Sequence, residues 1–288
     1  MNRESQVRIA FRKLFRNKLA TICFFVLTVE LLLILFAPYI CKYGPEEVDI
    51  LNRLKSGFWS SDNYDPAHLL GTDHLGRDVL TRLLYGGRVS ISVGLISTSI
   101  GIFFGTLFGL LAGYYKKLDN IIMRFMDLLF TFPGILLALL IVAILGVSTK
   151  NAIIAISIWS IPSFARMIRS KVLQVKEEDY ILAIKSLGAN DFRILTAHVL
   201  RNSFPLIIVI ATMRMASSIM SIATLSYLGL GCPPPTPEWG GMISVAREYM
   251  YDAPHLIIIP GLAVMITVIC FNVLGDKLRD VLDPSIKD

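Results

Sequence analysis

The sequence predicts an all-α polytopic membrane protein with six transmembrane helices, an interfacial helix before the first of them, and a pair of short helices between the fourth and the fifth. Three observations predict this class. Hydrophobic residues make up 54% of the 288 residues and charged residues only 17%, with a mean hydropathy of +0.62. The apolar residues gather in six long segments. The basic residues gather between alternate segments, which fits a chain that crosses a membrane repeatedly.

The six apolar segments approach or exceed the roughly 20 residues of helix that span a hydrocarbon core. In chain order they are 19–40, 89–115, 125–147, 151–165, 202–232 and 253–275. The fourth is free of charge only as far as Ala165, so we expect it to end nearer Arg169. The chain then divides into an interfacial helix at 1–18, a first span at 19–40, an external segment at 41–88, and a core of five spans at 89–288 that contains a polar loop at 170–202.

The basic residues orient this topology. With the N-terminus inside, nineteen of the 28 basic residues fall on one side of the membrane, eight fall on the other, and Arg214 lies within a span. By the positive-inside rule, both termini and the loop at 170–202 are expected in the cytoplasm. No face or tail is continuously basic, which argues against nucleic acid as a partner. Membrane lipid is the expected environment of the six apolar segments.

The N-terminal residues are basic and place Val7, Phe11, Leu14 and Phe15 on one helical face. This pattern is typical of a helix that lies along the inner headgroups. A cleavable signal peptide begins in a similar way, but segment 19–40 is longer than a signal h-region and lacks a small-x-small cleavage site. We therefore expect an uncleaved first span.

Two charged residues and several cysteines lie in or near the spans. Glu30 is either a functional carboxylate or a hydrogen-bond partner of a neighbouring helix, and both interpretations stay open. Arg214 interrupts the fifth span. The cysteines are Cys23, Cys41, Cys232 and Cys270, and their spacing matches no zinc or redox motif. A disulfide between Cys41 and Cys232 is conceivable on the outer side, although isolated thiols are the better interpretation.

The external segment carries charges of alternating sign: Asp73, Arg77, Asp78, Arg82 and Arg88. They can pair with each other or with a partner chain and hold the segment folded over the mouth of a pore, although single surface ion pairs contribute little. Gly71 and Gly76 imitate the spacing of a phosphate-binding loop, but the Lys and Ser or Thr of that motif are missing. His68 and His74, with no third ligand nearby, give weak support to a metal site.

Segment 89–115 contains Gly94, Gly101, Gly105, Gly109 and Gly113, of which the last four recur every four residues. Small residues at that spacing lie on one helical face and let another backbone approach closely. The spacing therefore predicts a packing face rather than a substrate site. Just after this segment, Asp119, Arg124 and Asp127 are expected to form salt bridges at the cytoplasmic interface.

The loop at 170–202 predicts two short helices. Tyr180, Ile184 and Leu187 recur at helical spacing, and so do Phe192, Leu195 and Val199. Between the two sets, Gly188 permits the left-handed conformation that ends a helix, and Asn190 or Asp191 can cap the next one. We call this loop, residues 170–202, the elbow. It combines an apolar side with a charged side.

Consecutive prolines at 233–235 forbid helix and favour an extended chain. They predict a stiff ledge outside the membrane. Trp239, Tyr249 and Tyr251 follow this ledge and suit the headgroup zone or a docked protein surface.

Several stretches together resemble one family. Leu70-Gly71-Thr72-Asp73-x-x-Gly76-Arg77-Asp78, the run from Gly229 through Pro233-Pro234 to Trp239-Gly240, and the ending Asp276 to Pro284 look like the signatures of the C-type permease subunit of dipeptide, oligopeptide and nickel ABC importers. The elbow resembles the "EAA" coupling loop of ABC importer permeases. Ala183, Gly188 and Leu200 match that pattern, whereas Leu182, Ile184, His198 and Arg201 depart from it.

The resemblance implies a permease of the ABC importer type in a bacterial or archaeal plasma membrane. Its implied partners are a homologous second permease, two ATP-binding subunits and an external solute-binding protein. ATP and Mg would be bound by the ATPase subunits, and this chain would hold no catalytic residue, cofactor or metal. The cargo would be dipeptides or oligopeptides, with nickel or glutathione as alternatives.

The resemblance also assigns residues. The coupling residues would be Ala183, Ile184, Lys185, Ser186, Leu187, Gly188, Ala189, Asn190 and Asp191. Among them Ile184, Leu187 and Ala189 would give apolar docking contacts, Lys185, Asn190 and Asp191 polar ones, and Gly188 the turn. The external signature would comprise Gly71, Thr72, Asp73, Gly76, Arg77, Asp78 and Trp239.

Two other classes are weaker. A secondary transporter driven by an ion gradient would need buried carboxylates or broken helices near the midplane, and Glu30 with Arg214 gives little support. A membrane enzyme would need a cluster of His, Cys, Ser or carboxylate residues at catalytic spacing, and the sequence offers none.

Overall fold

The computed structural model describes residues 14–60 and 63–282. The interfacial helix expected at 1–18 therefore lies largely outside the described residues. Within them, all regular elements are helical. In chain order they are α2 (Lys18–Leu35), α3 (Ala37–Ile40), η1 (Ile50–Asn52), α4 (Val79–Tyr114), α5 (Lys116–Thr131), α6 (Gly134–Leu145), α7 (Thr149–Lys176), α8 (Asp179–Ser186), α9 (Asp191–Arg193), η2 (Ile194–Leu200), α10 (Arg201–Tyr227), α11 (Trp239–Ala246), η3 (Arg247–Tyr249) and α12 (His255–Leu282).

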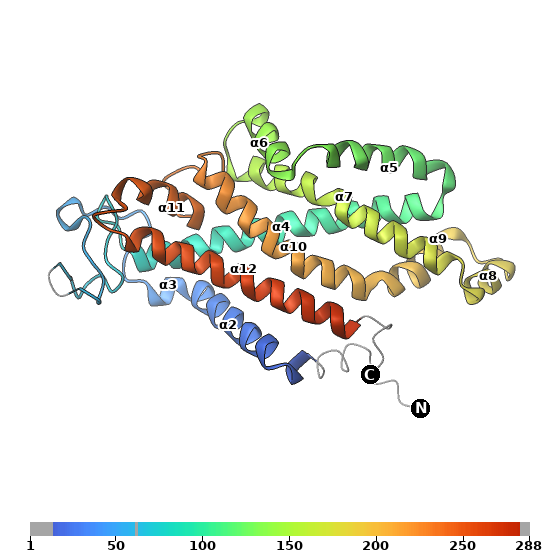
Figure 1. The fold of residues 1–288 in the computed structure, drawn as a ribbon, viewed down its shortest axis with the longest axis horizontal. Helices are drawn as coiled ribbons and strands as arrows, with labels where there is room; N and C mark the ends of the chain where they lie inside the picture. The colour runs from blue at the N-terminus through green and yellow to red at the C-terminus, as the bar shows by residue number, and fades with distance from the viewer. Residues whose placement is uncertain (1–13, 61–62, 283–288) are drawn as a thin grey trace.

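The long helices α4, α7, α10 and α12 lie side by side in an elongated bundle (Figure 1), and α4 packs most extensively on α7. Helix α2 packs on α12, while α5 and α6 cover α7 on the other side of the bundle. At one end of the bundle lie α8 and α9, and we call this the elbow end. At the opposite end lie the segment between α3 and α4 and the short helix α11, and we call this the far end.

In the part of the chain that the structure describes, five helices or continuous helical runs are long and apolar enough to cross a membrane, and the bent pair α5 and α6 brings the possible number to six. The expected spans are thus present, with different bounds. Helix α4 begins at Val79 because the Asp78 side chain accepts a hydrogen bond from the Thr81 N–H and caps its N-terminus. The fourth span continues to Lys176, beyond the end that we expected near Arg169.

The third expected span, 125–147, is not one straight helix. It breaks between α5 and α6, and the two pieces meet at 91°. Pro133 explains the break, because it lacks an N–H for the helix ladder and pushes the preceding residue out of the helical region. Phe132 accordingly has an extended backbone (φ −87°, ψ 133°).

The predicted packing face on α4 is confirmed. A Cβ added to Gly105 would lie 2.4 Å from the Cβ of Phe164 and 2.8 Å from a carbonyl oxygen of α7. A Cβ on Gly109 would lie 2.7 Å from the carbonyl oxygen of Ala165. These glycines therefore let the backbones of α4 and α7 touch, as small residues do in membrane helix pairs.

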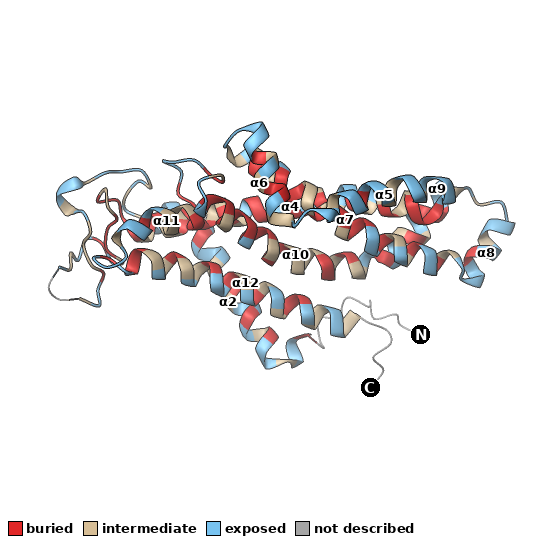
Figure 2. Ribbon diagram, turned by 45° about the horizontal axis from the view of Figure 1, so that its top comes forward, coloured by how far each residue is buried: buried red, intermediate tan, exposed pale blue. Residues whose placement is uncertain are grey.

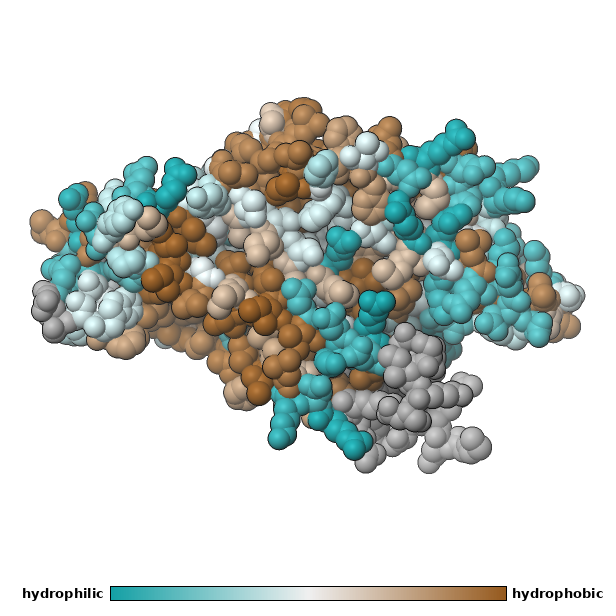
Figure 3. All heavy atoms as spheres, in the orientation of Figure 1, coloured by the Kyte–Doolittle hydropathy of each residue, from teal (hydrophilic) through white to brown (hydrophobic). Residues whose placement is uncertain are grey.

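Burial follows the same plan. The faces that α4, α7 and α10 turn toward one another are buried (Figure 2), whereas large apolar side chains remain exposed along α2, α6 and α12. In the space-filling view, hydrophobic residues gather over the middle of the molecule and hydrophilic ones over the elbow end and parts of the far end (Figure 3). An exposed apolar band between polar ends is the surface that a bilayer solvates.

Candidate coupling site

The elbow turns at Gly188, whose φ is +86°. Helix α8 ends there in a Schellman motif: the N–H of Ala189 donates to the carbonyl of Ile184 at 3.2 Å, and the N–H of Gly188 donates to that of Lys185 at 3.0 Å. No atom lies within 4 Å of the Cβ that a larger residue would carry at Gly188. Glycine is required here by backbone conformation and not by space.

The second arm of the elbow is capped by Asn190, whose side-chain oxygen accepts from the Arg193 N–H at 2.9 Å. This arm differs from the separate short helix that the sequence suggested. Helix α9 runs through the π-helical turn η2 directly into α10, so that residues 191–227 form one continuous helical run. The fifth span and the second arm of the elbow are therefore the same element.

Asp191 fastens the elbow to the bundle. Its carboxylate accepts a hydrogen bond from the Tyr114 hydroxyl at 2.6 Å, and Tyr114 is the last residue of α4. Lys176, the last residue of α7, donates to the Tyr114 carbonyl at 3.2 Å. Three elements thus meet at one tyrosine. The ends of α4, α7 and the α10 run are held together at the elbow.

A hydrophobic cluster fills the inside of the elbow. It includes Ile181 from α8, Ile194 from the second arm and Val172 from α7, all almost fully buried. Ile184 and Ala189 pack against the same cluster. Both side chains are only partly buried there, and the docking contacts expected of them stay a prediction.

The apolar surface of the elbow comes from other residues. Leu187 is 87% exposed, Phe192 is 74% exposed and Leu182 is 53% exposed. Of these, only Leu187 was expected as an apolar contact. Helical spacing alone could not show which positions of so short a helix face outward. Ala183, Lys185, Ser186 and Asn190 lie on the same two arms of the elbow.

A hollow of about 360 Å³ opens between α8 and the ends of α4 and α7. It is lined by Tyr114, Lys176, Glu177, Ile181, Leu182 and Lys185. Nearby, Asp119 of α5 forms a two-point ion pair with Arg169 of α7, at 2.5 and 2.6 Å, and Asp127 pairs with Arg166 at 2.7 Å. The expected salt bridges around α5 are confirmed, although neither includes Arg124. They tie α5 to α7 just above the elbow.

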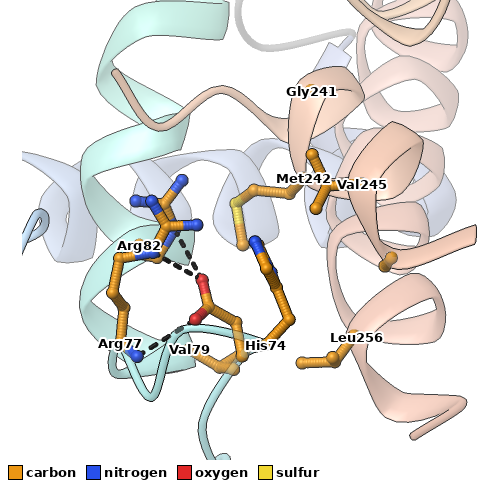
Figure 4. A pocket seen from close by; sticks show the side chains of 10 residues that line it. His74, Arg77, Val79, Arg82, Gly241, Met242, Val245 and Leu256 are labelled. Atoms are coloured by element: carbon orange, nitrogen blue, oxygen red, sulfur yellow. Dashed lines mark hydrogen bonds and ion pairs between the residues drawn. The ribbon is translucent and has the colours of Figure 1, made fainter. Parts of the chain in front are cut away.

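The far end is organised by a buried network of charges. Asp73 accepts from Arg77 Nε at 2.7 Å and forms a second ion pair with Arg82 at 3.5 Å. Both arginines face the same carboxylate oxygen, Asp73 Oδ2, beside a small cavity of about 40 Å³ that Arg77, Arg82, His74 and Met242 line (Figure 4). Burial lowers the pKa of His74, which favours the neutral ring. Asp73, Arg77 and Arg82 therefore pair with each other, which was one of the two expected alternatives, the other being pairing with a partner chain.

These far-end charges are not the weak surface pairs that the sequence suggested. Asp73, Arg77, Asp78 and Arg82 are all buried, so removing one partner would leave an uncompensated buried charge. Asp78 also forms a hydrogen bond with the His68 ring at 3.0 Å. Arg88 does not join them, since it donates to the last carbonyls of α2, those of Ile34 and Leu35. A basic side chain there caps the helix end.

The remaining signature residues shape the backbone of this network. Gly71 and Gly76 both have positive φ, and a Cβ on Gly76 would collide with the carbonyl oxygen of Asp49. Thr72 is fully buried; its hydroxyl oxygen accepts from the Lys55 N–H at 2.9 Å and its hydroxyl donates to the Asn52 carbonyl. The signature therefore builds a scaffold at the far end.

The prediction for the location of Trp239 is wrong. We expected it in the headgroup zone or on a docked surface, but the residue is 1% exposed. Its indole N–H donates to the Leu83 carbonyl at 2.9 Å, and its ring lies against Gly86 and Gly87 of α4. A large ring next to two glycines forms a close-packed joint. Trp239 thus locks α11 onto α4, while Tyr251 is exposed.

The charged and thiol residues of the spans are also placed. Glu30 of α2 accepts from the Thr267 hydroxyl of α12 at 2.6 Å, which favours the hydrogen-bonding interpretation. Cys41 and Cys232 are both free and lie in different hydrophobic clusters, so the conceivable disulfide is absent. Arg214 donates to the Ser163 hydroxyl of α7.

Comparison with known proteins identifies the family. Residues 101–288 match the model of the binding-protein-dependent transport system inner membrane component, and residues 5–57 match that of the N-terminal TM domain of oligopeptide transport permease C. A glutathione transport system permease protein, GsiD, of Pectobacterium atrosepticum is 45% identical over 278 residues, covering 96% of this chain and 90% of that protein. A dipeptide transport system permease protein, DppC, of Alkalihalophilus pseudofirmus is 43% identical, covering 97% and 90%.

The fold comparison agrees. A chain of the MetNI methionine ABC transporter, in an inward-facing conformation, superposes with a TM-score of 0.57 at 19% identity and covers 69% of this chain and 95% of that chain. This chain thus shares the helical fold of a chain in a solved ABC transporter. This chain therefore belongs to the binding-protein-dependent transport system inner membrane components, as a multi-pass C-type permease of the peptide and nickel ABC importer family.

Proposed function

We propose that this chain forms half of the translocation path of an ATP-driven importer for dipeptides or oligopeptides. The observation that carries the proposal is the similarity over 96 to 97% of the chain to permeases named for dipeptide and glutathione transport. Glutathione is itself a tripeptide, so a translocation path of one kind can carry both glutathione and other short peptides. Nickel is the third cargo that the family resemblance allows, although no similarity described above favours it.

The proposed orientation places the elbow end and both termini in the cytoplasm of a bacterial or archaeal cell. Its support is the charge distribution: basic residues such as Lys117, Lys171, Lys185 and Arg193 cluster at the elbow end of the bundle. The far-end scaffold then lies outside. An external solute-binding protein would deliver its cargo there.

The elbow would transmit the work of two separate ATPase subunits, which bind ATP and Mg. The exposed side chains of Leu182, Leu187 and Phe192 give it an apolar docking surface, and Lys185 adds a charge beside them. Coupling requires that the docking free energy differ between inward-facing and outward-facing states. Coupling also requires that a movement of the docked ATPase be transmitted to the spans. The elbow can transmit it, because the Asp191–Tyr114 hydrogen bond and the hydrophobic cluster hold the elbow to three spans.

A homologous second permease would complete the path. In this chain, large apolar side chains on α6 such as Leu136, Leu140 and Ile144 are exposed. They lie on the side of the bundle away from α2, where α5 and α6 cover α7 (Figure 1). Such a face is suited either to lipid or to a partner helix.

The proposal is tested in proteoliposomes that contain this chain, the second permease, the two ATPase subunits and the solute-binding protein. Radiolabelled dialanine and glutathione are offered outside, with ATP inside and the proton gradient collapsed by an uncoupler. We expect uptake that needs both ATP and the binding protein. Uptake that persists without ATP while a proton gradient is kept would contradict the proposal and favour a secondary transporter.

Topology is tested separately in intact cells. Lys185 should react with a membrane-impermeant amine reagent only after the membrane is opened, whereas Lys42 at the far end should react at once. Labelling of Lys185 in sealed cells would overturn the orientation and with it the coupling role of the elbow.

A further inference from the structure

Arg214 is an unusual residue for its position. It stands at the midpoint of α10, Arg201–Tyr227, with thirteen residues of helix on either side. At 1.5 Å of rise per residue, this places it about 20 Å from each helix end. Its side chain cannot extend to either membrane surface over that distance. A charge held at such a depth is costly and usually marks a function.

The surroundings of Arg214 do not neutralise it. One guanidinium nitrogen, Nη2, donates to the Ser163 hydroxyl, and the guanidinium carbon lies 5.9 Å from the centre of the Trp159 ring. Within residues 14–60 and 63–282, no carboxylate forms an ion pair with Arg214, and none of its other N–H groups has a hydrogen-bond partner. The guanidinium group is thus incompletely satisfied.

The neighbours of Arg214 are also hydrogen-bond donors. Ser163 accepts from Arg214 and keeps its own hydroxyl proton for another acceptor. The indole N–H of Trp159 makes no hydrogen bond in the described part of the chain. Arg214, Ser163 and Trp159 thus each keep a donor that has no acceptor in the described part of the chain, and we call these three residues the donor triad. An incoming carboxylate would supply that acceptor.

The triad lies on the side of the bundle that carries the broken span. Trp159 packs against the break itself, since a Cβ on Gly134 would lie 1.9 Å from the indole ring. Arg214 reaches toward α7, whereas α2 and α12 lie on the opposite side of α10 from α7 (Figure 1). Arg214 is only half-buried, so an approaching group can reach it.

We propose that the donor triad lies in the translocation path and pairs with the carboxylate of the cargo as it crosses the membrane. This inference rests on the proposed function, because every unmodified peptide and glutathione carries a carboxylate. A single arginine with two neutral donors also suits a path, since binding has to be strong enough for entry and weak enough for release. The cargo class that follows is anionic or zwitterionic.

The first experiment needs no transport. Ser163→Cys is introduced into the complete complex in nucleotide-free proteoliposomes. Its modification by the anionic sulfonatoethyl and the cationic aminoethyl methanethiosulfonate is timed above the background of the native cysteines. The ratio of the anionic to the cationic rate should fall at least about tenfold when Arg214→Met is added, because the local positive potential is lost. Arg214→Lys keeps the charge and should keep the ratio.

Two results of this experiment would overturn the proposal. If the thiol introduced at position 163 does not react with either reagent, the triad is closed to water and is not in a path. If that thiol reacts with an unchanged ratio in Arg214→Met, an acid of the second permease already neutralises the arginine and the site is an interface. Because neither result depends on uptake, both are distinct from a failure of the proposed importer function.

The second experiment measures dialanine uptake at saturating binding protein. Arg214→Met should lower the rate of uptake at least about tenfold, and Arg214→Lys should restore at least about a third of the wild-type rate, because a positive charge remains to pair with the carboxylate. The matched control is Lys150→Met, which removes a cation from the exposed start of α7 and should leave uptake unchanged. Equal loss in Arg214→Met and Arg214→Lys would show that Arg214 serves packing alone and would overturn the proposal.

Discussion

The turn at Gly188 gives the sharpest test of the coupling mechanism, because its structure separates strain from steric fit. Alanine at φ +86° would carry the cost of a left-handed conformation, about 1–2 kcal/mol. No atom within 4 Å of the added Cβ would contribute a clash. A cost of that size changes a conformational equilibrium roughly 5- to 30-fold. We therefore expect Gly188→Ala to reduce the peptide imported per ATP hydrolysed, with the complex still assembled.

The series of substitutions at Gly188 should follow backbone strain. Asn tolerates the left-handed region better than other residues, and a β-branched residue tolerates it least. Transport per ATP should therefore decrease in the order Gly, Asn, Ala, Val, with Gly188→Val inactive. The assay measures dialanine uptake and phosphate release in the same proteoliposomes. Assembly is checked by size-exclusion chromatography.

Gly229 is the matched control at the far end. It follows α10 in the same motif, with φ +77°, a hydrogen bond from the Leu230 N–H to the Leu225 carbonyl, and no atom near its added Cβ. Gly229→Ala should carry the same strain and leave the ratio of uptake to ATP hydrolysis unchanged. The reasoning is refuted if Gly188→Asn is worse than Gly188→Ala, or if Gly229→Ala uncouples transport equally.

Three further predictions concern stability. The first two are measured as the thermal midpoint or unfolding free energy of the purified complex, and the third as the yield of assembled complex. Asp73→Asn should destabilise the complex by about 3–5 kcal/mol, because two arginines stay buried without a counter-charge. The control, Asp280→Asn, breaks an exposed ion pair and should change the stability by less than about 0.5 kcal/mol. Equal effects of the two substitutions would contradict the burial argument. Trp239→Ala should cost about 3–5 kcal/mol by leaving a cavity, and a neutral result would place the ring at a surface after all. Gly105→Val should prevent the close contact of α4 and α7 and lower the yield of assembled complex, while wild-type yield would show that the helices can separate without loss.

The spans and the turn of the elbow could be predicted from sequence because each rests on a local signal. Apolar runs of about 20 residues have few alternatives to a membrane helix. A glycine after a helical repeat, followed by a capping Asn, specifies a turn over a few residues, and Gly188 and Asn190 form that turn. The glycine repeat of α4 likewise reports its own packing, since small side chains at every fourth position leave a groove.

Other features depend on contacts distant in sequence, and local patterns could not reveal them. Trp239 resembles an interfacial aromatic residue by composition, but its burial is decided by Gly86 and Gly87, which lie far earlier in the chain. The break at Pro133 changes the direction of the third span without changing its hydropathy, so a search for apolar runs cannot detect it. The proline itself is a local signal of a break, but membrane helices also accommodate proline without one.

The outward face of the elbow shows a third limit. Helix α8 is only eight residues long, and hydrophobic residues occupy five consecutive positions of it, 180–184. Ile181 is buried and Leu182 is exposed, although both are aliphatic and adjacent. Which of two such neighbours points inward depends on the ends of α4 and α7, and these are fixed by the tertiary fold. Propensity carries no information on that choice.

The continuity of residues 191–227 links the elbow to the donor triad. Asp191 and Arg214 lie on one helical run, separated by about 35 Å at 1.5 Å per residue. A movement at the elbow therefore reaches Arg214 without crossing a loop, although the π-helical turn and Pro205 allow the run to bend between them. If ATP-driven docking rotates the second arm, the guanidinium group moves relative to Ser163 on α7. The affinity of the donor triad for a carboxylate would then change with the nucleotide state of the ATPase subunits. Such a difference in affinity between the two states is what alternating access requires.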